Sequence, residues 1–137
     1  MDRHPPAWVS RWVGLPFEMG GRGPDAFDCW GLLRAVLLEI HGRAPETPSV
    51  APSDPTDRGA MEATFAATRP AWRPVAPEDA EVGDAIAFRL LGRPVHCGVV
   101  VARDRFLHAR QGFLSAIDRW SSPRWARRVE GFYRWSG

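Results

Sequence analysis

The sequence predicts an α+β fold in which one amphipathic helix packs against an antiparallel β-sheet. Two patterns carry this prediction. Apolar residues recur at helical spacing between residues 28 and 41. After residue 80 the pattern changes to short, strand-like apolar runs that are separated by turn-rich segments. Because the helix comes first and the strands follow one another, the order favours an antiparallel meander over an alternating α/β fold.

Length and composition predict a single globular domain that spans residues 1–137. Of the 137 residues, 45% are hydrophobic and 25% are charged, which is typical of soluble proteins. No apolar run approaches the roughly 20 residues of a membrane-spanning helix. The first ten residues contain no apolar stretch of the kind found in a signal peptide, so we expect synthesis in the cytoplasm without one. A net charge of +2 argues against nucleic acid as the partner.

The helix is predicted over residues 28–41. Its apolar stripe consists of Cys29, Leu32, Leu33, Val36, Leu37 and Ile40. Asp28 or Asp25 supplies the N-cap, since a short carboxylate side chain accepts hydrogen bonds from the first free backbone N–H groups. Gly42 ends the helix, because glycine readily adopts the left-handed conformation that follows a helix C-terminus.

The segment after the helix, residues 43–77, holds seven of the 13 prolines and is predicted to contain no regular sheet. One short helix is expected within it, at about residues 58–68. The sheet is predicted from four later segments, at residues 85–88, 95–101, 106–109 and 127–135. The last of these is expected to return as a strand beside the others.

Cys29 stands at the predicted N-terminus of the helix. The helix dipole and the free N–H groups there favour a thiolate, and they can also hold a developing oxyanion. This position suits a nucleophile. It equally suits the first apolar residue of a buried stripe, so position alone leaves both interpretations open.

A nucleophilic cysteine needs a base, for which histidine is the usual residue. His4 lies near the chain start, and His41 lies about 18 Å from Cys29 at the other end of the helix. His96 and His108 remain, each within a predicted strand. A single strand histidine is more often a hydrogen-bonded core residue, but two on one hairpin, downstream of a helix-cap cysteine, favour catalysis.

Strand alternation gives a condition for this pair. His96 and Gly98 share one face of their strand, and Gly98 leaves room for a helix end or a substrate. Cys97 lies on the other face and is expected to be a buried structural thiol. His108 shares the face of His96 only if the connection around residues 103–104 has an odd length or contains a bulge.

A third group must orient the base. His108 can do so. Asp84 and Asp104 compete for this role, although a Gly-Asp pair before a strand more often forms a cap or a turn. The cysteines and histidines lack the close paired spacing of zinc sites, so we expect neither a metal nor an organic cofactor. The two cysteines leave a single disulfide open as an alternative.

Four segments together resemble the NlpC/P60 family of cysteine peptidases. WVGLPFEMGGRGPDAFDCWGLLRAV is similar to the family's glycine-rich turn and Asp-Cys-x-Gly helix start. EVGDAIAF, VHCGVVV and FLHA follow in the family's order, so the resemblance covers residues 8–112. It implies a papain-like α+β fold, with Cys29 as nucleophile, His96 as base and His108 as the orienting residue. The implied substrate is a peptidoglycan stem peptide, often cut between D-Glu and a diamino acid.

Within this family the chain looks most like phage-tail and gene-transfer-agent cell-wall peptidases. The DCWGL form and the proline-rich insert at about residues 43–77 carry that likeness. It implies tail-hub or baseplate partners, and delivery within a phage-like particle to the cell wall in the periplasm. The alternatives are a weakly active or inactive structural tail-hub component, or an amidase or acyltransferase of the same superfamily.

The resemblance also places Asp28, Trp30 and Phe17 beside Cys29, at the oxyanion and substrate site. Many relatives have tyrosine where Phe17 stands, and its hydroxyl is thought to assist at the oxyanion. Phenylalanine cannot donate a hydrogen bond, and losing one such donor costs about 100- to 1000-fold in rate. The backbone N–H of Cys29 remains, and Trp30 or Arg22 offers a substitute donor.

The C-terminal segment DRWSSPRWARRVEGFYRW interleaves tryptophan with arginine. We favour the interpretation that its aromatic residues cover the core while its arginines are solvated. The alternative is an exposed Trp/Arg surface that docks to a partner or to an anionic or sugar-rich polymer.

Overall fold

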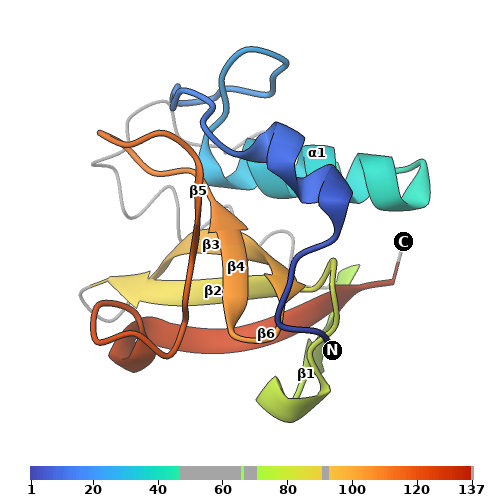
Figure 1. The fold of residues 1–137 in the computed structure, drawn as a ribbon, viewed down its shortest axis with the longest axis vertical. Helices are drawn as coiled ribbons and strands as arrows, with labels where there is room; N and C mark the ends of the chain where they lie inside the picture. Colours follow the sequence, from blue (N-terminus) through green and yellow to red (C-terminus); the bar gives the residue numbers. More distant parts are fainter. Residues whose placement is uncertain (47–65, 67–70, 91–92, 137) are drawn as a thin grey trace.

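The computed structural model describes residues 1–46, 66, 71–90 and 93–136. One α-helix, α1 (Cys29–His41), lies across one face of a six-stranded sheet (Figure 1). The strands are β1 (Trp72–Val75), β2 (Ala85–Leu90), β3 (Arg93–Ala102), β4 (Arg105–His108), β5 (Ala116–Asp118) and β6 (Val129–Trp135). Every neighbouring pair is antiparallel. This arrangement confirms the predicted α+β class.

The strand order in the sheet is β1-β6-β2-β3-β4-β5. Strands β2, β3 and β4 form the predicted meander, which β5 extends, and β6 returns to lie between β1 and β2. The four predicted strand segments are confirmed, although the last begins with a 3-10 turn, η4 (Ala126–Arg128), before β6. Two further 3-10 turns, η1 (Ala7–Trp12) and η3 (Pro77–Asp79), precede α1 and β2 respectively.

The prediction that residues 43–77 contain no sheet is wrong at β1. This strand includes Pro74, which has no N–H to donate. It can form because β1 is an edge strand that pairs only with β6, so Pro74 needs no second partner strand. The three-residue strand β5, at the opposite edge, was not predicted. The short helix expected at about 58–68 lies outside the described residues except for residue 66.

Helix α1 has the predicted bounds and caps. The Asp28 carboxylate accepts a hydrogen bond from the Gly31 N–H at 2.6 Å, which identifies Asp28 as the N-cap. Gly42 has a φ of 71° and donates its N–H to the Leu38 carbonyl, which ends the helix. The predicted apolar stripe is buried except for Ile40, which is 38% exposed near the helix C-terminus.

The core consists of two layers, one on each face of the sheet. The helix-side layer packs the α1 stripe against alternate residues of β3 and β4, namely Cys97, Val99, Val101 and Leu107. The far-side layer contains Ile86, Phe88, Val100, Phe106, Trp125 and Phe132. Each fully buried side chain of this size contributes about 1.5–3 kcal/mol through removal of apolar surface from water. The sheet is therefore anchored on both faces, and the residues at its centre are held rigidly.

Among the residues that the structure describes, no helix combines the length and the apolar character that crossing a membrane requires.

Candidate active site

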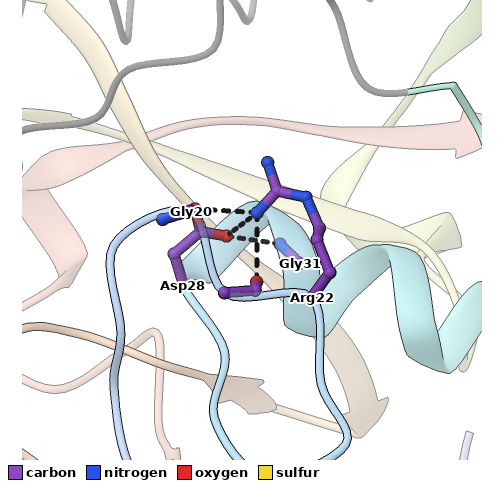
Figure 2. Close-up of polar contacts among 5 residues, drawn as sticks. Gly20, Arg22, Asp28 and Gly31 are labelled. Atoms are coloured by element: carbon purple, nitrogen blue, oxygen red, sulfur yellow. Dashed lines mark hydrogen bonds and ion pairs between the residues drawn. The ribbon is translucent and has the colours of Figure 1, made fainter.

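The loop before α1 builds a polar cap around the Asp28 carboxylate, which Figure 2 shows. Asp28 accepts hydrogen bonds from the Gly31 N–H at 2.6 Å and the Gly20 N–H at 3.0 Å. Nη1 of Arg22 lies 2.9 and 3.0 Å from the two carboxylate oxygens and also donates to the Gly21 carbonyl. Only glycine fits at position 31, because a Cβ there would collide with the Gly21 carbonyl oxygen. The cap thus fixes the first turn of α1.

Neighbouring groups shift the pKa of the Asp28 carboxyl in opposite directions. Burial raises the pKa of the Asp28 carboxyl, and the adjacent Cys29 acts in the same direction. The Gly31 N–H and the Arg22 guanidinium oppose that rise. Asp28 is therefore placed to hold the backbone of the helix start, directly before Cys29.

Cys29 is the first residue of α1 and is 7% exposed. A hydrogen bond with the Cys97 thiol lowers its pKa well below the ordinary value, and a hydrogen bond and charge from His96 lower it further, against the effect of burial. The pKa of Cys97 is raised well above its ordinary value by the same contact with Cys29 and by burial. The site therefore favours a thiolate on Cys29 and a neutral thiol on Cys97.

Cys97 lies where alternation predicted, in the helix-side layer and away from the far-side contacts of His96. Its burial is confirmed. Both cysteines are free, so the disulfide alternative is wrong for this structure. The contact between the Cys97 and Cys29 thiols was not predicted, because it depends on how α1 packs against β3.

The turn between β3 and β4 satisfies the condition set by the sequence. Ala102 pairs with Arg105 across a two-residue turn, in which Asp104 has a φ of 58°. The next pair is Val100 with Phe106, so Val101 is an extra residue that forms a bulge. This bulge brings His108 onto the face of His96.

Gly98 makes a close approach possible, and the nearest atoms around it belong to β4. A Cβ at Gly98 would lie 2.9 Å from the Leu107 carbonyl oxygen and 3.2 Å from the Cβ of His108. The absence of a side chain at this position therefore lets β4 pack tightly beside His96.

His96 and His108 form a hydrogen-bonded pair that continues to a carboxylate. His96 Nε2 lies 2.8 Å from His108 Nδ1, and His108 Nε2 lies 2.7 Å from Asp118 Oδ2. Burial, followed by the charge of His96, lowers the pKa of His108 to about 3, although Asp118 acts in the opposite direction. His108 is therefore neutral near pH 7. We call His96, His108 and Asp118 the histidine row.

Trp125 covers the histidine row from the far side of the sheet. Its ring stacks on His96 with centroids 5.6 Å apart and an interplanar angle of 19°, and it meets His108 edge-on at 5.1 Å. Trp125 is 4% exposed, and its Nε1 has no hydrogen-bond partner among the described residues. Packing of this kind restricts both imidazole rings and excludes water from them.

Sequence reasoning missed Asp118 as part of the site. Its strand is only three residues long and shows no apolar alternation. Trp125 was expected to cover the core, which is confirmed, but its contact with His96 was not foreseen. Four of the five arginines on the same segment, at positions 119, 124, 127 and 128, are exposed, in agreement with the favoured interpretation of solvated side chains. The fifth, Arg134, departs from it, because it is half-buried and paired with Asp84.

The other predicted site residues lie in different settings. Phe17 is half-buried and packs against the helix-side layer, and Trp30 is buried within that layer. Asp84 and Asp104, the competitors for the third role, lie in turns. Asp84 is paired with Arg134, and Asp104 accepts hydrogen bonds from Ser121. Within the described ranges, no three His, Cys, Asp or Glu side chains are grouped so as to hold a metal ion.

Known proteins are similar to this chain in sequence. A model of the NlpC/P60 family matches residues 14–134. "Probable endopeptidase NlpC homolog" of Haemophilus influenzae is 24% identical over 118 residues, which are 86% of this chain and 54% of that protein. "Protein P54" of Enterococcus faecium is 25% identical over 105 residues, which are 77% of this chain and 17% of that protein. The chain thus spans at most about half the length of these relatives.

Solved structures show the same fold. The NlpC/p60 domain of the peptidoglycan hydrolase SagA superposes with a TM-score of 0.60 at 22% identity, covering 93% of this chain and 92% of that one. An NlpC/P60 family protein from Bacillus cereus superposes with a TM-score of 0.67 at 19% identity, covering 99% and 42%. At these identities the structural likeness establishes the architecture.

Proposed function

Since this chain belongs to the NlpC/P60 family, we propose that it is a cysteine peptidase that hydrolyses peptidoglycan stem peptides. One observation carries the proposal: Cys29, at the N-terminus of α1, contacts His96, and His96 Nε2 lies 2.8 Å from His108 Nδ1. A thiolate beside an oriented imidazole is the arrangement that acyl transfer requires. The family and the names of two relatives, an endopeptidase homologue and a peptidoglycan hydrolase, support this substrate class.

The proposed reaction has two stages. The Cys29 thiolate adds to the carbonyl carbon of the scissile amide, and the resulting oxyanion is held at the start of α1. The His96 imidazolium then protonates the leaving amine as the C–N bond breaks, which leaves a thioester on Cys29. In the second stage His96 removes a proton from water, and the hydroxide that forms releases the acid and the thiol. No step requires a metal or an organic cofactor.

The oxyanion site distinguishes this chain from relatives with a tyrosine at the position of Phe17. Phe17 packs against the core and has no donor group. We assign the oxyanion chiefly to the backbone N–H of Cys29, because the Asp28 cap occupies the Gly31 N–H instead. A single-donor site of this kind is consistent with slow turnover.

The finer part of the proposal concerns the bond and the carrier. We propose cleavage between D-Glu and the diamino acid, and delivery of the protein by a phage-tail or gene-transfer-agent-like particle. The support is the DCWGL sequence at Cys29 and the proline-rich segment that follows α1.

The test is digestion of purified peptidoglycan by the wild type, Cys29→Ala and His96→Ala, with released fragments identified by mass. We expect stem-peptide fragments from the wild type and none from either variant. Fragment masses identify the bond and separate a peptidase from an amidase or acyltransferase. If folded wild type releases nothing, the structural alternative replaces this proposal. If release survives Cys29→Ala, the assignment of the nucleophile is wrong.

A further inference from the structure

Asp118 is the one member of the histidine row to which the reaction above gives no role. It ends β5 and pairs with Phe106 on β4, while His108 pairs with Ala116. Asp118 and His108 are therefore diagonal neighbours on the same face of the sheet. Their side chains meet at 2.7 Å, although the Asp118 side chain is 39% exposed and that of His108 only 2%.

The protons of the row can be placed from this geometry. A carboxylate only accepts hydrogen bonds, so Nε2 of His108 must carry the proton that joins it to Asp118. A neutral imidazole carries one proton, so Nδ1 of His108 is an acceptor. The contact at 2.8 Å then requires that His96 donates from its Nε2. This leaves Nδ1 as the His96 ring nitrogen available to Cys29.

The groups around the His108 ring determine which of its two nitrogens carries the proton. The ring is closed in by Phe106 and Trp125, with centroids 4.5 and 5.1 Å away, so water has little access to it. The ionisable groups that act on it are His96 on β3, Asp118 on β5 and Arg110 just after β4. Of these, only Asp118 offers a full negative charge, and it meets Nε2 directly. In the opposite tautomer the Nδ1–H of His108 would face the Nε2–H that a His96 imidazolium carries, so two donors would meet at this contact.

We propose that Asp118 is a positioning residue that fixes the Nε2–H tautomer of His108, so that His108 accepts a hydrogen bond from His96 and stabilises the His96 imidazolium. Asp118 acts through two rings and does not contact the substrate. The catalytic consequence rests on the proposed function. The proton arrangement does not, and it can be measured without turnover.

The first test is the ¹⁵N chemical shifts of the His108 ring in the wild type and in Asp118→Asn. An amide is nearly the same size as a carboxylate, but it can turn either an acceptor or a donor toward Nε2. We expect protonated Nε2 and unprotonated Nδ1 in the wild type, and shifts toward a mixture in the variant. An unchanged His108 spectrum in Asp118→Asn overturns the proposal.

The second test is the pH profile of Cys29 alkylation by iodoacetamide, with the modified residue located by peptide mass. A less stable His96 imidazolium disfavours the thiolate, so half-maximal reactivity should move up by about one pH unit in Asp118→Asn. Asp118→Glu, which restores a carboxylate, should recover part of this shift. Identical profiles for the wild type and Asp118→Asn overturn the proposal. In peptidoglycan digestion we expect kcat to fall about 10-fold while KM stays unchanged, in line with a shift of one pH unit.

Asp104→Asn is the matched control. It makes the same chemical change in a carboxylate of the neighbouring β3–β4 turn, where Asp104 pairs with Arg119 and not with a histidine. We expect an unchanged His108 spectrum and alkylation profile. Failure of the proposed function and failure of the Asp118 role are distinguishable. If Asp118→Asn shifts the spectrum and the profile but the wild type releases no peptidoglycan fragments, the role of Asp118 stands and the proposed function fails. If the wild type releases fragments but Asp118→Asn leaves the spectrum unshifted, the function stands and the role of Asp118 fails.

Discussion

The Asp28 cap and the histidine row each place a carboxylate next to a residue of the proposed catalytic site, but they do so in contrasting ways. Asp28 is buried and receives two backbone N–H groups and a guanidinium (Figure 2). Asp118 is partly exposed, and its Oδ2 meets the ring nitrogen of His108. The Asp28 carboxylate thus fixes the backbone at the start of α1. The Asp118 carboxylate instead accepts a hydrogen bond from an imidazole, whose proton can move between its two nitrogens.

This contrast separates stability from reactivity. Removing Asp28 leaves backbone N–H groups and Arg22 without their acceptor, which affects the fold. Removing the charge of Asp118 affects the distribution of protons along a row that is otherwise held by packing against Trp125. We therefore expect substitutions in the cap to change the free energy of unfolding, and substitutions in the row to change the rate.

The largest expected effect tests the row itself. His96→Gln preserves a hydrogen-bonding side chain but removes the proposed base, so kcat should fall by about 10⁴-fold or more. Its melting temperature should stay close to that of the wild type, measured by circular dichroism beside the peptidoglycan assay. His41→Gln, at the exposed C-terminal end of α1, is the matched control and should keep full activity. A His96→Gln enzyme with near-normal kcat contradicts the assignment of the base.

The two regions should also respond to acid with opposite sign. The folded state holds the pKa of His108 at about 3, while the unfolded chain has the ordinary value of about 6.5. Below pH 6.5 only the unfolded state takes up this proton, so the contribution to stability is complete above pH 6.5. It is lost progressively as the pH falls toward 3, by at most about 1.4 kcal/mol per pH unit. Urea unfolding between pH 4 and pH 7 measures this slope.

His108→Gln should flatten that slope relative to the wild type. Asp28→Asn is its matched control, because burial raises the pKa of Asp28 and a raised carboxyl pKa favours the folded state on acidification. Asp28→Asn should therefore keep the slope that His108 causes. An equal slope in His108→Gln and the wild type would show that folding does not lower the pKa of His108.

The next largest effect is a loss of stability when the Asp28 cap is removed. Asp28→Ala removes the N-cap and the partner of Arg22, and the free energy of unfolding should fall by about 2–3 kcal/mol. Asp28→Asn keeps an acceptor for the Gly31 N–H and should lose less. Denaturant titration of both variants measures the difference. Equal stability of Asp28→Ala and the wild type would mean that α1 is held by its apolar face alone.

The sequence predicted those parts of the fold whose signals are local. Helical periodicity and the caps Asp28 and Gly42 fixed α1, and short apolar runs fixed the central strands. Strands β1 and β5 were missed because each is an edge strand of four residues or fewer, whose existence depends on a partner strand. Neither carries a periodic signal of its own.

In the candidate site, too, residues with local sequence signals were predicted and residues placed by distant segments were not. Cys29, His96 and His108 were predicted to lie together. Strand alternation allowed the two histidines to share a face only with an odd-length connection or a bulge, and the bulge at Val101 meets that condition. Asp118 and the stacking of Trp125 could not be predicted in this way. Both reach the histidines from segments that follow β4, and their positions depend on the path of the chain after the predicted motif ends.

The smallest expected effect concerns Trp125, which lies against the row but takes no part in its proton arrangement. Its buried Nε1 has no hydrogen-bond partner among the described residues, and such a group costs about 1–3 kcal/mol. Trp125→Phe removes that cost while it loses part of the stacking area on His96, so the two effects offset each other. We expect Trp125→Phe to have a kcat and an unfolding free energy close to those of the wild type. Trp125→Ala should lower both values, because it removes the stacking on His96. A large loss of kcat with unchanged stability in Trp125→Phe would show that the indole N–H donates during the reaction.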